Sequence, residues 1–317
     1  MLHLRLVVPP DDLQRVLEVL VPERGVANLA VLPGAAREPA GDLVLCDVTR
    51  ESAHSVLREL RRLGLPEHGS ISVEQVDLTM SAAADRAERL APGSPADALV
   101  WEEVQAKTSE ESELSWTFLT FISVATLIAG IGVLLDQTVL IIGAMVVGPE
   151  FGAIAGLCVA ILRRRRELAL RSARALVVGF PVAIAVTTLA TLAGRAVGLV
   201  EDDMLDAAHP LTSFVSRPDA FSFVVAFLAG IVGMLSLTSA KSGALIGVLI
   251  SVTTVPAAGY IGVALALGEP GGAGGAVAQL AINLVALVVA GVLTLAAQSS
   301  LWQRVRPSRR SRTASPA

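Results

Sequence analysis

Charged residues, aromatic residues and cysteine are all scarce in this 317-residue chain. Only 17% of its residues are charged and 4% are aromatic, whereas 53% are hydrophobic. About a quarter of the residues in an ordinary soluble domain are charged, so a purely soluble fold is excluded. The apolar excess lies almost entirely in residues 114–301, and residues 1–113 hold a normal mixture of charges. The chain therefore divides into an N-terminal soluble part and a membrane part.

Cysteine and histidine are too few to build the sites in which they usually act. The two cysteines, Cys46 and Cys158, lack metal-type spacing, so both are interpreted as buried thiols. All four histidines lie outside the long apolar segments, and no His-Glu-x-x-His motif is present. These absences argue against an enzyme, so we expect no catalytic residue, no metal site and no cofactor. A nucleic-acid partner is not expected either.

Residues 1–78 are predicted to form an α+β domain of the ferredoxin-like type. Alternating apolar side chains from Leu2 to Val8 predict a half-buried strand. The remaining predicted elements are a helix after Pro10, strands over 26–32 and 43–48 separated by a loop over 33–42, a helix capped by Thr49, and a strand over 71–78. The order β-α-β-β-α-β is that of the ferredoxin-like unit. Such a domain could be a simple cap or oligomerisation module, or a sensor that gates the membrane part.

Residues 79–113 are predicted to connect the two parts of the chain. Residues 79–95 are rich in Ala, Asp, Arg, Pro and Gly, a composition typical of a linker. Ser94 and Pro95 resemble a helix start, and a polar helix is expected to continue to Glu113. The N-terminus lacks a charged region followed by an apolar core, so no signal peptide is expected. The soluble part is therefore expected to stay in the cytoplasm.

The membrane part, 114–301, is predicted to contain six transmembrane helices. They cover 114–135, 138–162, 169–193, 220–239, 242–267 and 277–301. Basic residues concentrate on one side of this arrangement, at Arg163–Arg166, at Lys241 and in the tail 302–317. The positive-inside rule then places these segments and both termini in the cytoplasm. We therefore expect a multi-pass protein of the plasma or inner membrane.

Each half of the membrane part contains a proline near the middle of a span. Pro149 interrupts the second span and Pro256 interrupts the fifth. Because three is an odd number, a second copy of a three-span unit would be inverted, which predicts a 3+3 inverted repeat. An Ile-Gly pair precedes each proline, at 142–143 and 246–247, with spacings that differ by three residues. Interrupted helices at matching positions often mark the binding site of a transporter.

The residues predicted to bind a substrate or ion flank these two prolines. If the second span breaks at Gly148, then Pro149 and Glu150 begin a new half-helix. A carboxylate inside the bilayer is expected to be functional, so Glu150 is interpreted as a proton or cation site. The alternative is that it only offsets the dipole of the half-helix. The second half contributes hydroxyl groups, an amide and the second helix break, at Ser251, Thr253, Thr254, Pro256 and Asn283. Asn283 could instead hold neighbouring helices together.

Small residues recur at every fourth position of the second span. They are Ala144, Gly148, Gly152, Gly156 and Ala160. This stripe predicts the close approach of another backbone. It also makes a homo-oligomer plausible, so the expected partners are the lipid bilayer and further copies of the chain.

The run IIGAMVVGPEFG over residues 141–152 resembles the signature of a bacterial membrane family. This family is the domain of unknown function 389 family, also called the uncharacterised hydrophobic domain family. Gly243-Ala244 and Val255-Pro256 follow in the expected order, and the resemblance covers about residues 114–298. Family members often carry a second proline where this chain has Ala153, and many carry an apolar residue in place of Glu150. The resemblance implies the membrane fold and topology, and it implies no activity.

Three functions of different classes follow from these features. The leading hypothesis is a secondary transporter or channel for a small ion or solute, with its site at the midplane between the two breaks. The alternative is a membrane-anchored sensor or scaffold whose ferredoxin-like domain binds a metabolite or partner. An intramembrane enzyme is the third, and it would require turnover that depends on Glu150.

Overall fold

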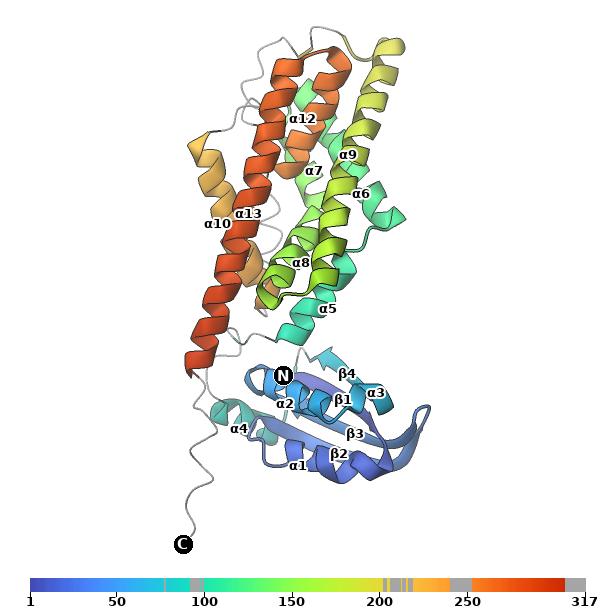
Figure 1. Ribbon diagram of the computed structural model, residues 1–317, viewed down its shortest axis with the longest axis vertical. Helices are drawn as coiled ribbons and strands as arrows, with labels where there is room; N and C mark the ends of the chain where they lie inside the picture. Colours follow the sequence, from blue (N-terminus) through green and yellow to red (C-terminus); the bar gives the residue numbers. More distant parts are fainter. Residues whose placement is uncertain are drawn as a thin grey trace. The chain divides into compact units, whose positions relative to one another are not determined.

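The computed structural model describes residues 1–76, 78–91, 98, 100–201, 204–205, 212, 215, 219–239 and 253–305. The chain forms two compact units. The first is built mainly from Met1–Glu103, and the second begins at Val104 and contains the long apolar helices. Figure 1 shows the helices and strands of each unit.

The first unit is a four-stranded antiparallel sheet with helices in the order that the sequence predicts. Its elements are β1 (Leu2–Val8), the 3-10 turn η1 (Pro10–Asp12), α1 (Leu13–Leu20), β2 (Val26–Arg37), β3 (Ala40–Val48), α2 (Arg50–Arg62), the single turn α3 (Leu65–His68) and β4 (Ser70–Gln75). The strand order is β2-β3-β1-β4, and each neighbouring pair is antiparallel. Element order and strand order together are those of a ferredoxin-like domain.

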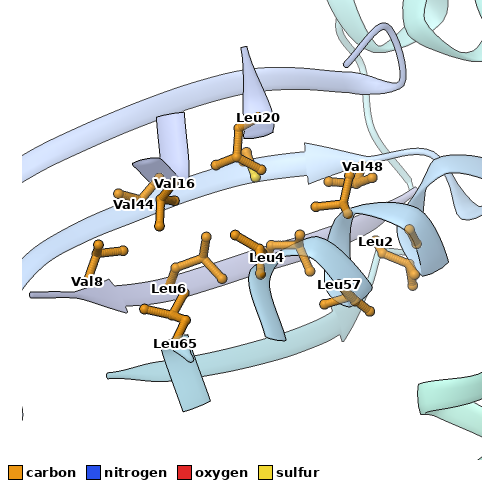
Figure 2. Close-up of a cluster of buried hydrophobic side chains, with 14 of the residues drawn as sticks. Leu2, Leu4, Leu6, Val8, Val16, Leu20, Val44, Val48, Leu57 and Leu65 are labelled. Carbon is orange, nitrogen blue, oxygen red and sulfur yellow. The ribbon is translucent and has the colours of Figure 1, made fainter. Parts of the chain in front are cut away.

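The core of this unit follows from the alternation along β1. Leu2, Leu4, Leu6 and Val8 are all buried, and they pack with the apolar side chains of β3, α1 and α2 (Figure 2). Cys46 lies in the same core, where burial raises the pKa of its thiol to about 12. A thiol with such a pKa is uncharged and unreactive at neutral pH, which agrees with the interpretation of Cys46 as a buried thiol.

The prediction of a loop over 33–42 was wrong, because β2 and β3 extend through it as a long hairpin. Arg37 pairs with Ala40, so the turn consists of Glu38 and Pro39 alone. The strand absorbs Pro33 and Gly34 at a register shift between Leu32 and Ala36. Proline is tolerated there because β2 lies at the edge of the sheet and a bulge needs no ladder hydrogen bond at every residue.

The predicted linker also contains a regular element. Residues Ala82–Leu90 form helix α4, and the Ser81 hydroxyl accepts a hydrogen bond from the backbone N–H of Ala84. Ala84 and Ala87 are buried, so a small apolar face supplies the packing that composition alone did not reveal. The polar helix that was predicted next is α5 (Trp101–Glu111), and the expected cap at Ser94 lies outside the described residues.

The second unit consists of apolar helices. They are α6 (Trp116–Leu134), α7 (Thr138–Val147), α8 (Glu150–Arg163), α9 (Arg166–Ala196), α10 (Ala220–Thr238), α12 (Thr254–Leu267) and α13 (Pro270–Val305). By length and composition, α6, α9, α10 and α13 can each cross a membrane. The second predicted span is the pair α7 and α8, which is bent by 51° at its break. The fifth predicted span is described only from Thr253 onward, where α12 follows.

Helices in the two halves of this unit share one sequence offset. Glu150 and Thr254, the first residues of α8 and α12, are 104 positions apart, and both helices have 14 residues. The same offset of 104 relates α6 to α10, which both have 19 residues. It also relates the starts of α9 and α13, which follow α8 and α12 after two residues each.

The ends of the related helices are built alike as well. Ser115 accepts a hydrogen bond from the N–H of Phe118 at the start of α6, and Asp219 does the same for Ser222 at the start of α10. Both α8 and α12 end in a residue with left-handed backbone, Arg164 and Gly268. A backbone hydrogen bond of 2.9 Å closes each of these two turns. The local hydrogen bonds of these caps and turns therefore also occur at equivalent positions in the two halves.

Packing between the helices depends on glycines that allow close approach. A Cβ atom at Gly259 of α12 would lie 2.8 Å from the backbone nitrogen of Gly130 in α6. A Cβ at Gly262 would lie 2.7 Å from the Cβ of Thr187 in α9. Thus α12 packs against α6 and α9 through glycine, the small-residue packing typical of membrane helices.

Residues at the end of α5 pack against the predicted stripe of small residues. A Cβ at Gly152 or Gly156 would collide with Glu111 or Ser112 at the end of α5. The Ser112 hydroxyl donates a hydrogen bond of 3.3 Å to the Gly152 carbonyl oxygen. The stripe therefore serves contacts within this chain.

We expect Gly259→Ala to lower the free energy of unfolding by about 1–3 kcal/mol, because its Cβ would meet backbone atoms that cannot move aside independently. Thermal unfolding of the detergent-solubilised protein measures this change. Gly143→Ala in α7 is the control, since a Cβ there meets no atom within 4 Å. Equal stability of the two variants would contradict the close packing of α12 on α6.

Candidate functional site

The break between α7 and α8 falls at the predicted position. Helix α7 ends at Val147, and α8 begins at Glu150 with Pro149 as its N-cap residue. Proline lacks the backbone N–H that would continue the helical ladder, so its ring ends α7 and starts α8. Glu150 is therefore the first residue of the new half-helix, as the sequence predicts for a break at Gly148.

The Glu150 carboxyl group is buried and only half of it is hydrogen-bonded. The side chain is 3% exposed, and its Oε1 accepts a hydrogen bond of 2.7 Å from the Thr254 hydroxyl. Its Oε2 is also buried and has no hydrogen-bond partner among the described residues. This oxygen lies over Gly148, where any Cβ would collide with it. Glycine at position 148 thus leaves the room that the carboxyl group occupies.

Thr254 is the first residue of α12, so the starts of two half-helices meet at this hydrogen bond. Thr253 is the N-cap residue of α12, and Pro256 lies in its first turn. A Cβ at Gly148 would also lie 2.7 Å from Cγ2 of Val255, which brings the break itself against α12. The predicted residues Gly148, Pro149, Glu150, Thr253, Thr254 and Pro256 are therefore gathered in one place, whereas Ser251 lies outside the described residues.

The two half-helices point in opposite directions from this meeting point. Helix α9 begins two residues after α8 ends and has 31 residues, so it is roughly 46 Å long at 1.5 Å per residue. Near its far end, Arg195 donates a hydrogen bond of 2.7 Å to the carbonyl oxygen of Ala266 in the last turn of α12. The C-terminal ends of α8 and α12 therefore lie at opposite ends of α9, and Figure 1 shows the same separation.

A second group of polar side chains surrounds the N-cap of α12. Asn283 of α13 donates a hydrogen bond of 2.6 Å to the Thr253 hydroxyl, and Gln279 approaches the same oxygen at 3.3 Å. Gln279 also donates to Asn283 at 3.4 Å, and its own Oε1 is buried without a partner among the described residues. Both amides are 1% exposed. Gln279 was missed from the sequence, although its spacing of four residues from Asn283 places the two amides on one helix face.

The polar groups are distributed unequally between the two halves. Applying the offset of 104 residues to Thr253, Gln279 and Asn283 leads to Pro149, Ala175 and Gly179. The first half thus places apolar residues where the second half places a hydroxyl and two amides. Since α8 and α9 form at the counterpart positions without these groups, the fold alone does not require them.

We expect Thr254→Val to lower the free energy of unfolding by about 1–3 kcal/mol, because it leaves the buried Oε1 of Glu150 without its donor. Chemical denaturation of the purified protein measures the loss. Thr126→Val is the matched control, since the buried Thr126 hydroxyl bonds only a carbonyl of its own helix. An effect of the same size in both variants would show that the Glu150 contact contributes nothing.

The region that contains this site is similar to a family of membrane proteins. Residues 145–289 match the family model described as "Domain of unknown function (DUF389)", a region that runs from α7 into α13. An uncharacterised protein of Methanocaldococcus jannaschii is 26% identical over 199 residues, which are 63% of this chain and 59% of that protein. The chain therefore matches less than two thirds of the length of this relative. No solved structure matches the chain. Through the part that carries α8 and α12, the chain is similar to the DUF389 family.

Proposed function

We propose that this membrane protein is a secondary transporter or channel for a small ion or solute. Its site is the point where the N-terminal ends of α8 and α12 meet. The hydrogen bond between Glu150 and Thr254 carries the proposal, because it joins two broken helices that are 104 residues apart in the chain. Broken helices whose N-termini meet inside the bilayer are the recurring binding element of secondary transporters.

An inverted repeat is part of this proposal, and the contacts between helices support it. Thr187 of α9 lies against Gly130 and Gly262, which belong to α6 and α12. Gly291 of α13 lies against Met234 and Cys158, which belong to α10 and α8. Each residue of the second contact is the counterpart, at the offset of 104, of a residue of the first: Gly291 of Thr187, Met234 of Gly130, and Cys158 of Gly262. A two-fold axis between the halves produces such pairs of equivalent contacts.

The backbone contacts of these helices follow the same exchange. A Cβ at Gly262 would lie 3.1 Å from the carbonyl oxygen of Ile184. Cys158, the counterpart of Gly262, lies 3.6 Å from the carbonyl oxygen of Val288, the counterpart of Ile184. Glu150 and Thr254 are counterparts of each other, so their hydrogen bond would lie on the two-fold axis. In transporters of this architecture the substrate site lies between the repeats, near the midplane.

The topology that we propose has six spans with both termini in the cytoplasm of the cell. Opposite directions of α8 and α12 support an inverted second half, in which we propose 242–267 as the fifth span. The four arginines Arg163–Arg166 lie where α8 ends and α9 begins, so the positive-inside rule assigns that end of the unit to the cytoplasm. We further propose the plasma or inner membrane as its location and a homo-oligomer as its assembly.

The polar groups at the meeting point favour a site over a purely structural break. Glu150, Thr254, Gln279 and Asn283 are buried and Thr253 is partly buried, and polar groups inside a membrane are costly unless they have partners. A carboxylate alone could serve to offset the dipole of α8. It would not account for Thr253, Gln279 and Asn283, whose counterparts in the first half are apolar.

We expect protein in liposomes to produce charge movement on a solid-supported membrane when gradients of pH, small ions or metabolites are imposed. Thr254→Val should reduce the rate by about tenfold, because losing a hydrogen bond to a carboxyl group costs about 1.4 kcal/mol or more at the site. Thr126→Val, whose hydroxyl lies outside the site, should retain the wild-type rate. A wild-type transport rate in both variants would show that transport does not depend on the meeting point of α8 and α12.

Silence of the wild-type protein in electrical and tracer-flux assays, with folding verified, would contradict transport. It would favour the alternative, in which the ferredoxin-like domain binds a metabolite or partner and the helices anchor it.

A further inference from the structure

We propose that the meeting point of α8 and α12 binds a single positive charge, either a proton or a monovalent metal cation, on Oε2 of Glu150. This inference rests on the proposed function and names its substrate or coupling ion. It starts from the state of the carboxyl group, in which one oxygen accepts a hydrogen bond from Thr254 and the other is buried without a donor.

The charges around Glu150 favour a cation over an anion. No lysine, arginine or histidine forms an ion pair with Glu150 in the described part of the chain, so the described groups leave an ionised carboxylate there without a compensating charge. A second negative charge would be repelled by it. A divalent cation would leave an excess positive charge in the apolar unit, whereas one positive charge makes the site neutral.

The helix dipoles do not remove this need for a positive charge. Two N-terminal ends face the carboxyl group, and each contributes about 0.3–1 kcal/mol, or up to about 2 kcal/mol when partly buried. Burying an ionised group costs several kcal/mol even after the protein relaxes. The dipoles therefore offset part of the cost, and a proton or cation on Oε2 removes the remainder.

Further oxygen atoms at the N-cap of α12 are of the kind that suits a small cation. Thr253 precedes Thr254 in the chain, and its hydroxyl is held by Asn283 and Gln279. Gln279 keeps a buried Oε1 without a partner among the described residues. Hydroxyl, amide and carboxylate oxygens are the ligands that hard cations prefer. The proposal explains why only the second half carries these polar side chains, because a single cation needs one set of oxygen ligands.

Other ionisable groups near this half-helix must be separated from Glu150 in any test. Glu111 of α5 packs over Gly152 in the first turn of α8. Burial raises the pKa of the Glu111 carboxyl group, Lys107 opposes this rise and Glu110 adds to it. Gly148 at the C-cap of α7 and Thr254 of α12 lie against the Glu150 carboxyl group, and neither of them titrates. Glu111→Gln is therefore the control for titration outside the site.

The experiment measures the thermal unfolding midpoint of the purified full-length protein in detergent at pH 5.5 and pH 8.5. Sodium, potassium or lithium replaces choline at constant ionic strength. If a metal cation binds, it should raise the midpoint at pH 8.5 by about 5 °C at saturation, with a smaller effect at pH 5.5, where protons compete. If only a proton binds, the midpoint should fall on going to pH 8.5 whichever cation is present.

Glu150→Gln should abolish either response, because a neutral amide takes up no proton and supplies no negative charge to hold a cation, and Glu111→Gln should retain it. Infrared difference spectra should show the C=O band of a protonated carboxyl group that disappears in Glu150→Gln. A Glu150→Gln variant that keeps the wild-type dependence on pH and cations would overturn the inference. Flux without any such response would refute the cation site and leave transport standing, whereas binding without flux would do the reverse.

Discussion

The hydrogen bond between Glu150 and Thr254 is the contact on which the membrane unit is organised. Each partner is the first residue of its helix, so the contact brings the N-terminal ends of α8 and α12 together. Pro149 starts α8 directly, while Thr253 and Pro256 define the first turn of α12. Glycines at positions 148, 259 and 262 then let the surrounding helices come close enough to exclude water. Burial of the carboxyl group is the consequence of that packing.

The equal offsets explain why one contact can organise so much of the unit. Helices α6, α8 and α9 have counterparts in α10, α12 and α13, with equal lengths for the first two pairs. Under the proposed inverted repeat, the Glu150–Thr254 bond joins a position to its own counterpart. Any movement of one half relative to the other would then change the geometry of this hydrogen bond. A site at such a point can bind its ligand and respond to rearrangement of both halves.

Local patterns in the sequence predicted much of this fold. Alternation along β1 and the proline in the second span act within a few residues, and both predictions were confirmed. The hairpin of β2 and β3 was missed because pairing across Glu38 and Pro39 outweighs the local preference of Pro33 and Gly34 for a loop. Helix α4 was missed because its stabilising burial involves only two alanines.

The site was predicted in part, for a similar reason. Aligning Pro149 with Pro256 left a mismatch of three residues, because the two prolines occupy different positions in their half-helices. The structural offset instead equates Glu150 with Thr254 and agrees with the Ile-Gly pairs at 142–143 and 246–247. Gln279 was missed because a single glutamine in an apolar helix becomes informative only when its neighbours Thr253 and Asn283 are known.

The central claim, that α8 and α12 leave one point in opposite directions, is tested most directly by labelling single cysteines from each side of the membrane. Arg165→Cys and Glu269→Cys occupy equivalent exposed turns after α8 and α12, in a background with Cys46 and Cys158 replaced. A membrane-impermeant thiol reagent added to intact cells should label position 269 at once and position 165 only after the membrane is permeabilised. Labelling of both positions from the same side would contradict the inverted arrangement and, with it, the site between the two half-helices.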